Sequence, residues 1–375
     1  MRIRCQRGKF VPLFSVIERF TSTRDVQQVI QNVKIVANES GVTLMATDRE
    51  VSARGELPQD DSIIVERAGE TILPAKLLKK VFAESTADEF LIELKDSGLT
   101  IEGRNANYRL DMISEPETFP AVASFQATSF YKIPVNSFNR LVGRTVFATE
   151  TNNSHYELRG VKFFFSKDRV TAVATDGRRL AYQECSAEAV AEDQNAKEVE
   201  DKEAIFPTRA LNLVKNADAD ADEILIAVRD TEAQIKFGNI VVSTTLMTGR
   251  FPDWNTIVPE KAQKKRVDFI ADELARSIRQ AEIVATENKP GVWFKFEKGK
   301  VNITAAGDAT GQSNVELPLT YDSEPSEFRL DSRFLNEFLR EIPAEETVAL
   351  YFSENDYRTL FETSDGYRYV VMQLV

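Results

Sequence analysis

The sequence predicts an α+β protein built from three copies of one domain, each with two helices packed on antiparallel β-sheet. The first observation is a repeated strand: residues 170–176 read V-T-A-V-A-T-D, residues 42–48 read V-T-L-M-A-T-D, and a weaker copy lies at 301–306. The second observation is that each third of the chain has two segments with helical spacing of apolar residues. The third is Phe119-Pro120, which recurs as Phe251-Pro252 near the end of the second copy. A period of this length indicates repeated domains and not a solenoid.

The chain of 375 residues is long enough for three domains of ordinary size. We expect the first domain to span residues 1–127, the second 128–259 and the third 260–375.

In the first copy, apolar residues at helical spacing predict helices over 7–20 and over 75–82, the second of which follows Pro74. Alternating and β-branched residues predict strands at 31–37, 42–46, 51–57, 90–94, 99–102 and 108–113.

The second and third copies repeat this order. The second has predicted helices over 134–147 and 207–214 and predicted strands at 160–165, 169–174, 223–228, 233–237 and 240–246. The third has helices over 271–284 and 331–342 and a last strand at 368–374. Three cations, Lys76, Arg209 and Arg333, fall at the same place in the second helix of each copy.

One stretch interrupts the repeated plan. Residues Ser186 to Ala204 are rich in Ala, Glu, Asp and Lys and show no apolar period. We interpret this stretch as a solvated acidic loop, with a partner-binding tail as the alternative.

Composition excludes several classes of protein. Only Cys5 and Cys185 are present, which excludes a disulfide framework and a cysteine-rich zinc site and favours a reducing compartment. No apolar run reaches the roughly 18 residues of a membrane helix, and the N-terminus lacks a signal-peptide pattern, so we expect a cytoplasmic protein without a membrane partner. The net charge of -12, taken alone, argues against a nucleic-acid partner.

No catalytic motif emerges from the sequence. His155 is the only histidine, and neither a phosphate-binding loop nor a dinucleotide fingerprint is present. Asp48 and Asp176 recur at strand ends, where an aspartate usually closes an Asx-type turn; paired catalytic carboxylates are the alternative. We therefore expect no catalytic residue, no metal and no cofactor.

The predicted helices differ in charge from the rest of the chain. Lys and Arg outnumber Asp and Glu in these six segments, and both helices of the second copy lack Glu, although the whole chain is acidic. Cations are also good helix formers on exposed faces. The functional interpretation is a set of helices that presents cations to the phosphates of a nucleic acid without reading its bases.

Three motifs resemble one known family. Ala174–Ala181 (A-T-D-G-R-R-L-A), Gly249–Trp254 (G-R-F-P-D-W) and Tyr369–Met372 (Y-V-V-M) are similar to segments of bacterial DNA polymerase III beta subunits, the sliding clamps, and the likeness runs the full length. The resemblance implies a head-to-tail homodimer that forms a six-domain ring around duplex DNA. It implies a processivity factor for DNA replication, which tethers polymerases and has no catalysis of its own.

The resemblance also implies a pocket for short partner peptides between the second and third domains. The expected pocket residues are Leu158, Thr175, Gly177, Arg178, Arg179, Leu180, Pro252, Ile257, Val370 and Met372. Their types suit the role, because aliphatic side chains make an apolar floor and glycine admits a close backbone. The chain departs from the family at Gln373-Leu374-Val375, where a proline, a hydrophobe and a basic residue are usual, and at Thr256, where a basic residue is common.

The resemblance places further residues at the DNA and at the dimer seam. Family positions that face DNA correspond to Arg24, Lys76, Asn152 and Tyr156, and helix position alone adds Arg140, Arg144, Arg209 and Arg276. At the seam, Tyr108 and Leu110 of one chain are expected to pack against Ile283 and Val284 of the other.

Expected partners are double-stranded DNA, a second copy of the chain, the replicative polymerase catalytic subunit, the clamp loader, and repair polymerases and mismatch-repair proteins that carry clamp-binding peptides. A monomeric scaffold without DNA contact and a carboxylate-based enzyme remain the alternatives.

Overall fold

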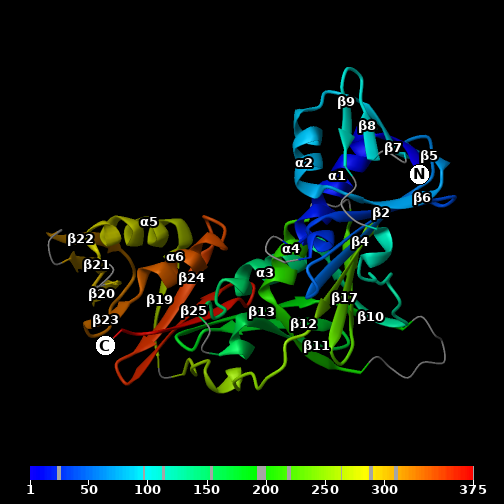
Figure 1. Cartoon of the computed structure of the whole chain (residues 1–375). Helices are drawn as coiled ribbons and strands as arrows, with labels where there is room; N and C mark the ends of the chain where they lie inside the picture. The colour runs from blue at the N-terminus through cyan, green and yellow to red at the C-terminus, as the bar shows by residue number, and fades with distance from the viewer. Residues whose placement is uncertain are drawn as a thin grey trace. The chain divides into compact units, whose positions relative to one another are not determined.

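The computed structural model describes the whole chain except residues 23–26, 96–97, 112–114, 153–154, 192–199, 218–220, 263, 287–289, 308–310 and 375. In the described part, the helices of eight or more residues are α1 (Arg7–Ile17), α2 (Ala75–Glu84), α3 (Val135–Val146), α4 (Thr208–Lys215), α5 (Ala271–Ala281) and α6 (Ser332–Arg340) (Figure 1). The recorded strand pairs of the described residues are antiparallel, so the predicted α+β class with antiparallel sheets is confirmed.

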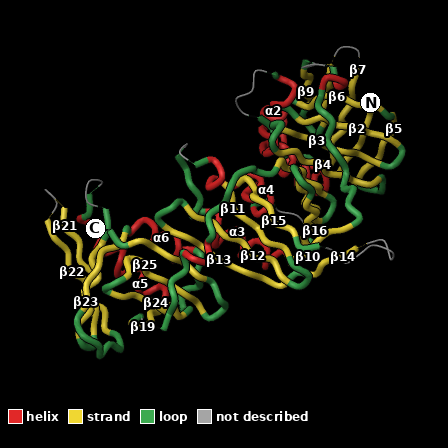
Figure 2. Tube along the Cα trace, turned by 90° about the horizontal axis from the view of Figure 1, so that it is seen from below, coloured by secondary structure: helices red, strands yellow, loops and turns green. Residues whose placement is uncertain are grey.

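The chain divides into two compact units. Unit 1 comprises Met1–Val135, Ala187–Lys202 and Arg209–Leu246, and unit 2 comprises Asn136–Ser186, Glu203–Thr208 and Met247–Val375. Each unit has two sheets and its own helices, which Figure 2 shows in yellow and red.

Unit 1 has a nine-stranded and a five-stranded sheet. In spatial order, the large sheet is β14 (Glu188–Ala191), β10 (Ser129–Pro134), β16 (Glu223–Val228), β17 (Glu232–Phe237), β18 (Ile240–Thr245), β4 (Val51–Pro58), β3 (Gly41–Thr47), β2 (Val33–Asn38) and β6 (Gly69–Leu73). The small sheet is β5 (Ile63–Arg67), β1 (Arg2–Gln6), β7 (Glu89–Lys95), β8 (Gly98–Glu102) and β9 (Asn107–Leu110).

Aromatic side chains from three elements form part of the core of unit 1. Phe82 of α2 lies 5.8 Å from Phe10 and 5.2 Å from Phe14 of α1, between ring centroids, and 5.1 Å from Phe90 of β7. All four rings are buried. Each such ring contributes about 1.5–3 kcal/mol through removal from water, so these contacts fix both helices on the small sheet.

Unit 2 has an eight-stranded and a four-stranded sheet. The large sheet is β15 (Lys202–Pro207), β11 (Gly160–Phe165), β12 (Arg169–Thr175), β13 (Arg179–Ser186), β26 (Arg368–Met372), β25 (Asp356–Thr363), β24 (Thr347–Ser353) and β19 (Lys265–Ile270). The small sheet is β22 (Gly311–Pro318), β21 (Lys300–Gly307), β20 (Val292–Glu297) and β23 (Ser326–Leu330). Helices α5 and α6 lie side by side (Figure 1), and Phe338 of α6 stacks on Tyr369 of β26 at 4.7 Å between ring centroids.

The repeat extends to individual hydrogen bonds. Thr47 and Thr175 each end a strand, and the hydroxyl of each accepts from the amide two residues later, at 3.0 and 3.1 Å. Lys76, Arg209 and Arg333 are each the second residue of their helix, α2, α4 and α6. The prediction that these cations occupy equivalent places is confirmed.

Some predicted elements differ from the structure. Helical structure over 7–20 is α1 followed by the 3-10 turn η1 (Glu18–Phe20), and over 271–284 it is α5 followed by η6 (Glu282–Val284). The predicted loop over Ser186–Ala204 is wrong at its ends, where Ser186 belongs to β13 and residues 202–204 belong to β15, and at β14, which pairs with β10. This short edge strand depends on a partner strand far away in the sequence, so its local composition does not reveal it. Residues 192–199 of that stretch lie outside the described part.

Candidate functional site

The turn between β12 and β13 is held by its own side chains. The Asp176 Oδ1 atom accepts hydrogen bonds from the amides of Arg178 and Arg179, at 2.9 and 3.0 Å. The Thr175 hydroxyl donates to the Arg179 carbonyl at 2.6 Å, and Gly177 has a φ of 84°. The Asx-turn interpretation of Asp176 is confirmed.

The equivalent turn of the first repeat has the same bonds. Asp48 Oδ1 accepts from the amides of Glu50 and Val51, at 3.1 and 2.8 Å. Its second oxygen accepts from Arg209 Nε at 2.5 Å. Both recurring aspartates are therefore engaged by turn amides and an arginine, which gives the carboxylate-enzyme alternative no support.

An apolar cluster lies beside the Asp176 turn on one face of the large sheet of unit 2. We call Val173, Leu180, Tyr182, Leu360 and Val370 the Leu180 cluster. Its members come from adjacent strands: Leu180 of β13 is directly opposite Val370 of β26, and Val370 is opposite Leu360 of β25. Alternate residues of a strand share a face, so these side chains necessarily meet.

The segment that links the second and third repeats packs against this cluster. Phe251, Trp254, Ile257 and Val258 pack against it while remaining partly exposed. Trp254 lies 4.8 Å from Tyr182 between ring centroids. Arg358 of β25 fixes the segment by donating to the carbonyls of Thr256 and Ile257, at 2.9 and 3.3 Å.

The expected pocket residues differ widely in exposure. Leu180 and Val370 are buried at 0% and 1% exposure, whereas Met372 is 39% exposed. Thr175 and Leu158 are also buried, Gly177 and Arg178 are exposed, and Pro252 and Ile257 are partly exposed. The structure brings Leu180, Val370 and Ile257 together in one cluster, and joins Met372 to the turn through its amide, which donates to the Arg178 carbonyl at 2.9 Å. The recorded members of this cluster do not include Leu158.

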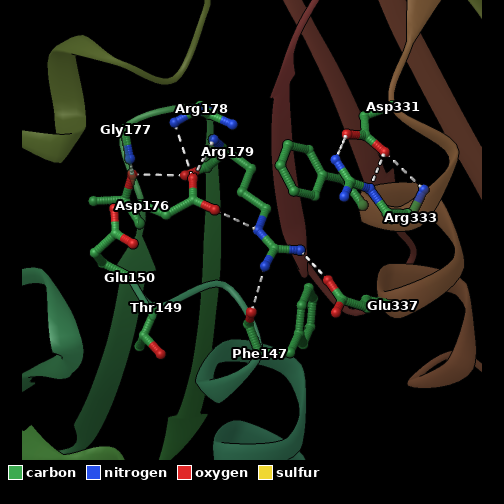
Figure 3. Close-up of polar contacts among 12 residues, drawn as sticks. Phe147, Thr149, Glu150, Asp176, Gly177, Arg178, Arg179, Asp331, Arg333 and Glu337 are labelled. Carbon is green, nitrogen blue, oxygen red and sulfur yellow. Dashed lines mark hydrogen bonds and ion pairs between the residues drawn. The ribbon is translucent and has the colours of Figure 1, made fainter. Parts of the chain in front are cut away.

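The Arg179 side chain does not line this apolar surface, contrary to the expectation from the motif. Successive strand residues point to opposite faces, so Arg179 faces away from its neighbour Leu180. Its guanidinium donates to Asp176 Oδ2 at 2.9 Å and to the Phe147 carbonyl at 2.6 Å, and it pairs with Glu337 of α6 (Figure 3).

The unusual chain end is fixed by backbone hydrogen bonds. The Gln373 amide donates to the Tyr357 carbonyl and the Leu374 amide to the Arg329 carbonyl, both at 2.8 Å. Tyr357 is 62% exposed and precedes Arg358, whose Cα is opposite that of Met372. Sequence reasoning missed Tyr357 as a surface residue here, because strand register is not visible in the sequence. Trp254 could have been found, since it ends the quoted G-R-F-P-D-W motif.

The expected DNA-facing residues are mostly exposed. Lys76, Arg140, Asn152, Tyr156, Arg209 and Arg276 are exposed, and Arg24 lies outside the described residues. Arg144 corrects the expectation: it is 4% exposed, and its Nη1 atom donates to Asp365 at 2.6 Å and to Gln183 at 2.7 Å. A buried, paired guanidinium cannot reach a phosphate, so helix position alone misassigned it.

The expected seam residues lie in or beside edge strands. Tyr108 and Leu110 belong to β9, the last strand of the small sheet of unit 1. Ile283 and Val284 belong to η6, which contacts the edge strand β22 in unit 2. Ile283 is 77% exposed.

Among the residues that the structure describes, no group of three or more His, Cys, Asp or Glu could hold a metal ion. Within the same ranges, no helix is long and apolar enough to cross a membrane.

Comparisons with known proteins agree across sequence and fold. Residues 1–123 match the model of the DNA polymerase III beta subunit N-terminal domain, and residues 132–253 match that of its central domain. The chain is 25% identical over 358 residues to the beta sliding clamp of Rickettsia bellii, covering 90% of this chain and 88% of that protein. It is 22% identical over 378 residues to the beta sliding clamp of Vibrio cholerae, with both chains fully covered.

Solved structures have the same fold over the full length. The sliding clamp of Bacillus subtilis has a TM-score of 0.90 at 18% identity, with 100% of this chain and 99% of that chain covered. The sliding clamp of Pseudomonas aeruginosa bound to griselimycin has a TM-score of 0.89 at 22% identity, with the same coverage. The two family models, the named relatives and the shared fold lead to one conclusion: the chain belongs to the family of bacterial DNA polymerase III beta subunits, the beta sliding clamps.

Proposed function

We propose that two copies of this chain close head to tail into a ring around duplex DNA and tether the replicative polymerase for processive synthesis. The observation that carries the proposal is a pair of open sheet edges. Strand β9 ends the small sheet of unit 1 and β22 ends the small sheet of unit 2, and each has a hydrogen-bonded neighbour on one side only in the described part of the chain.

Open edges favour a head-to-tail contact. An exposed edge presents unpaired backbone donors and acceptors, which pair readily with another strand. Because β9 and β22 are different edges of the same chain, β9 of one copy can meet β22 of the other at both seams, and two such contacts close a ring. The exposed Ile283 beside β22 would be covered by Tyr108 and Leu110 at the same contact.

The proposed DNA contacts are non-specific. Lys76, Arg140, Arg209 and Arg276 are exposed cations on α2, α3, α4 and α5, and Asn152 and Tyr156 add polar contacts. Cations on helices bind phosphates independently of sequence, which suits a protein that moves along DNA. Arg24 stays in this proposed set, and Arg144 is left out because it is buried.

The proposed peptide pocket has the buried residues Leu158, Thr175, Leu180 and Val370 as its floor, and Met372, Ile257, Pro252, Gly177 and Arg178 as its accessible rim. Comparison of the repeats supports one pocket per chain. Ser52 of the first repeat and Ser243 of the second form the strand pair that corresponds to Leu180 and Val370.

The segment that connects the first and second repeats is bonded to this serine pair through Gln234. Gln234 donates to the Ser124 carbonyl at 2.9 Å and to the Ser243 hydroxyl at 3.3 Å, and its side-chain oxygen accepts from the Gln126 amide at 3.1 Å. A polar floor bonded to the linker offers no apolar anchor for a partner peptide.

Partners of the pocket would be the polymerase catalytic subunit, the clamp loader, repair polymerases and mismatch-repair proteins, each through a short peptide. The ring would act in the cytoplasm, where a bacterial chromosome lies. Catalysis would belong to the polymerase, and the clamp would contribute only tethering.

Sedimentation tests ring formation. The wild-type protein should sediment as a dimer of the 42.3 kDa chain at micromolar concentration. Ile283→Glu should sediment as a monomer, because it buries a charge in an apolar contact, while Ile64→Glu, another exposed hydrophobic residue on β5, should remain a dimer. A wild-type protein that sediments as one chain would contradict the ring and favour a monomeric scaffold.

A further inference from the structure

We propose that Arg179 is a positioning residue that sets the shape of the partner-peptide pocket by anchoring strand β13 to helix α6, and that it does not bind the peptide itself. The inference rests on the proposed pocket. We call the group formed by Arg179, Asp176, Phe147, Phe334 and Glu337 the Arg179 network. The proposal assigns a role to Arg179, Glu337 and Phe334.

The guanidinium is bonded on three sides by three different elements. Nε donates to Asp176 in the turn, Nη2 donates to the Phe147 carbonyl just after α3, and Nη1 pairs with Glu337 on α6 (Figure 3). The three nitrogens therefore each have an acceptor, and the side chain is only 6% exposed. A peptide that bound this group would first have to displace an existing partner.

Two aromatic rings complete the network. The central guanidinium carbon lies 4.3 Å from the centroid of Phe334 and 5.5 Å from that of Phe147. Planar stacking and a three-way fork are geometries that arginine satisfies and lysine does not. The side chain thus joins the second repeat, through the turn and α3, to the third repeat, through α6.

The network is connected to the pocket through the backbone. Arg179 precedes Leu180 in β13 and is opposite Val371 of β26, while Leu180 is opposite Val370. The carbonyl of Arg178 accepts from the Met372 amide at 2.9 Å. Fixing Arg179 therefore fixes the separation between the floor at Leu180 and the rim at Met372.

The first repeat lacks both the arginine at this strand position and the apolar residue that follows it. Val51 corresponds to Arg179 in the equivalent turn, and Ser52 corresponds to Leu180. Val51 is buried, and its aliphatic side chain cannot form the ion pairs that hold Arg179. In the first repeat the turn aspartate Asp48 is held instead by Arg209 of α4, so an arginine at the strand position before the floor residue accompanies the apolar floor in the second repeat only.

A double-mutant cycle on peptide affinity tests the proposal. The probe is a fluorescein-labelled synthetic peptide that covers the clamp-binding segment of the organism's own replicative polymerase, titrated with full-length protein and followed by anisotropy. The variants are Arg179→Met, Glu337→Gln and the double variant. Arg333→Met is the control. Arg179 and Arg333 both line one hollow of about 260 Å³, but Arg333 is bonded to Asp331 and not to Glu337.

We expect Arg179→Met to weaken the peptide roughly tenfold and Glu337→Gln roughly threefold, with the double variant no weaker than Arg179→Met, since both remove one network. Arg179→Lys should not restore affinity. Arg333→Met should bind as the wild type does. If Arg179 instead bound an acidic group of the peptide, Glu337→Gln would release the cation, and affinity would stay the same or rise.

Three results would overturn the proposal: unchanged or tighter binding in Glu337→Gln, additive losses in the double variant, or a lower melting temperature with unchanged affinity in the folded protein. The last result would mean that the network only stabilises the fold. Failure of the wild-type protein to bind the peptide would instead refute the pocket itself, and so is distinguishable from failure of the Arg179 role.

Discussion

Arg49 and Gly177 have the same left-handed backbone conformation, with φ of 81° and 84°, at the same position of equivalent turns in the first and second repeats. The amide of each donates to the threonine hydroxyl two residues earlier. Glycine adopts this left-handed conformation readily, whereas for other residues it is unfavourable by about 1 kcal/mol or more. The turn geometry is therefore conserved between the repeats even where the residue type does not suit it.

Substitutions at this position should have opposite effects on stability. Gly177→Ala should lower the free energy of unfolding by about 1 kcal/mol, because a Cβ there meets no atom within 4 Å and only the backbone conformation is strained. Arg49→Gly should be more stable than Arg49→Ala by about 1 kcal/mol, since both remove the side chain and only glycine removes the strain. Denaturant unfolding measures both; an Arg49→Gly variant less stable than Arg49→Ala would contradict this account.

Arg140 and Arg144, one helical turn apart on α3, should affect different properties. Arg144→Met should lower the free energy of unfolding by about 2–4 kcal/mol, because it leaves Asp365 without its buried partner. Arg140→Met should leave stability within about 0.5 kcal/mol and weaken DNA binding, because Arg140 is exposed. The measurements are thermal unfolding and the salt dependence of DNA affinity. Weaker salt dependence in folded Arg144→Met would contradict its assignment as a structural residue.

Met372→Ala should reduce peptide affinity without loss of stability. Met372 is 39% exposed at the pocket rim, so its truncation should cost about 1–2 kcal/mol of binding, about 5- to 30-fold in affinity. Leu180→Ala should also lose binding, but it is fully buried and should destabilise the fold by about 2–5 kcal/mol. Anisotropy titration and thermal unfolding separate the two effects. Normal affinity in both variants would exclude the assigned pocket.

Low pH should weaken the attachment, near Thr256, of the segment that links the second and third repeats. Burial alone would raise the pKa of Asp356, but hydrogen bonds from Arg358 and the ion pair with Lys264 lower it to about 2. The folded state therefore favours the charged carboxyl, and the resulting stability is present above its ordinary pKa near 4 and lost as the pH falls toward 2. Solvent screens part of this interaction, so at neutral pH it is worth about 1–2 kcal/mol.

Asp356→Asn should accordingly lower stability at pH 7 and flatten the decline between pH 4 and pH 2. Asp253→Asn, which changes an exposed carboxyl, is the matched control and should follow the wild-type curve. Thermal unfolding at a series of pH values measures this, and an unchanged acid transition in Asp356→Asn would refute the role of this carboxyl.

The repeated architecture could be predicted from the sequence because its signals are local. Apolar spacing located each of the helices α1 to α6 of the described residues, and the aspartates at the two strand ends were correctly interpreted as turn residues. Strand β14 could not be predicted, because its formation depends on pairing with β10, far away in the sequence.

The site was predictable only in part, for the same reason. The motifs located Leu180, Val370 and the linker. They did not reveal that Arg144 is buried against Asp365 or that Arg179 is paired with Glu337, because these partners are 221 and 158 residues away. Whether a cation faces solvent or a buried carboxylate is decided by such distant contacts.

Topological retention on DNA tests the central claim most directly. The protein would be loaded onto nicked circular DNA with a compatible clamp loader and ATP, then passed through a gel-filtration column before and after the circle is cut. A closed ring predicts co-elution with the circle and loss from the linear DNA, because a ring slides off a free end. Equal retention on both forms, or no co-elution with a loader that loads another clamp, would contradict encirclement.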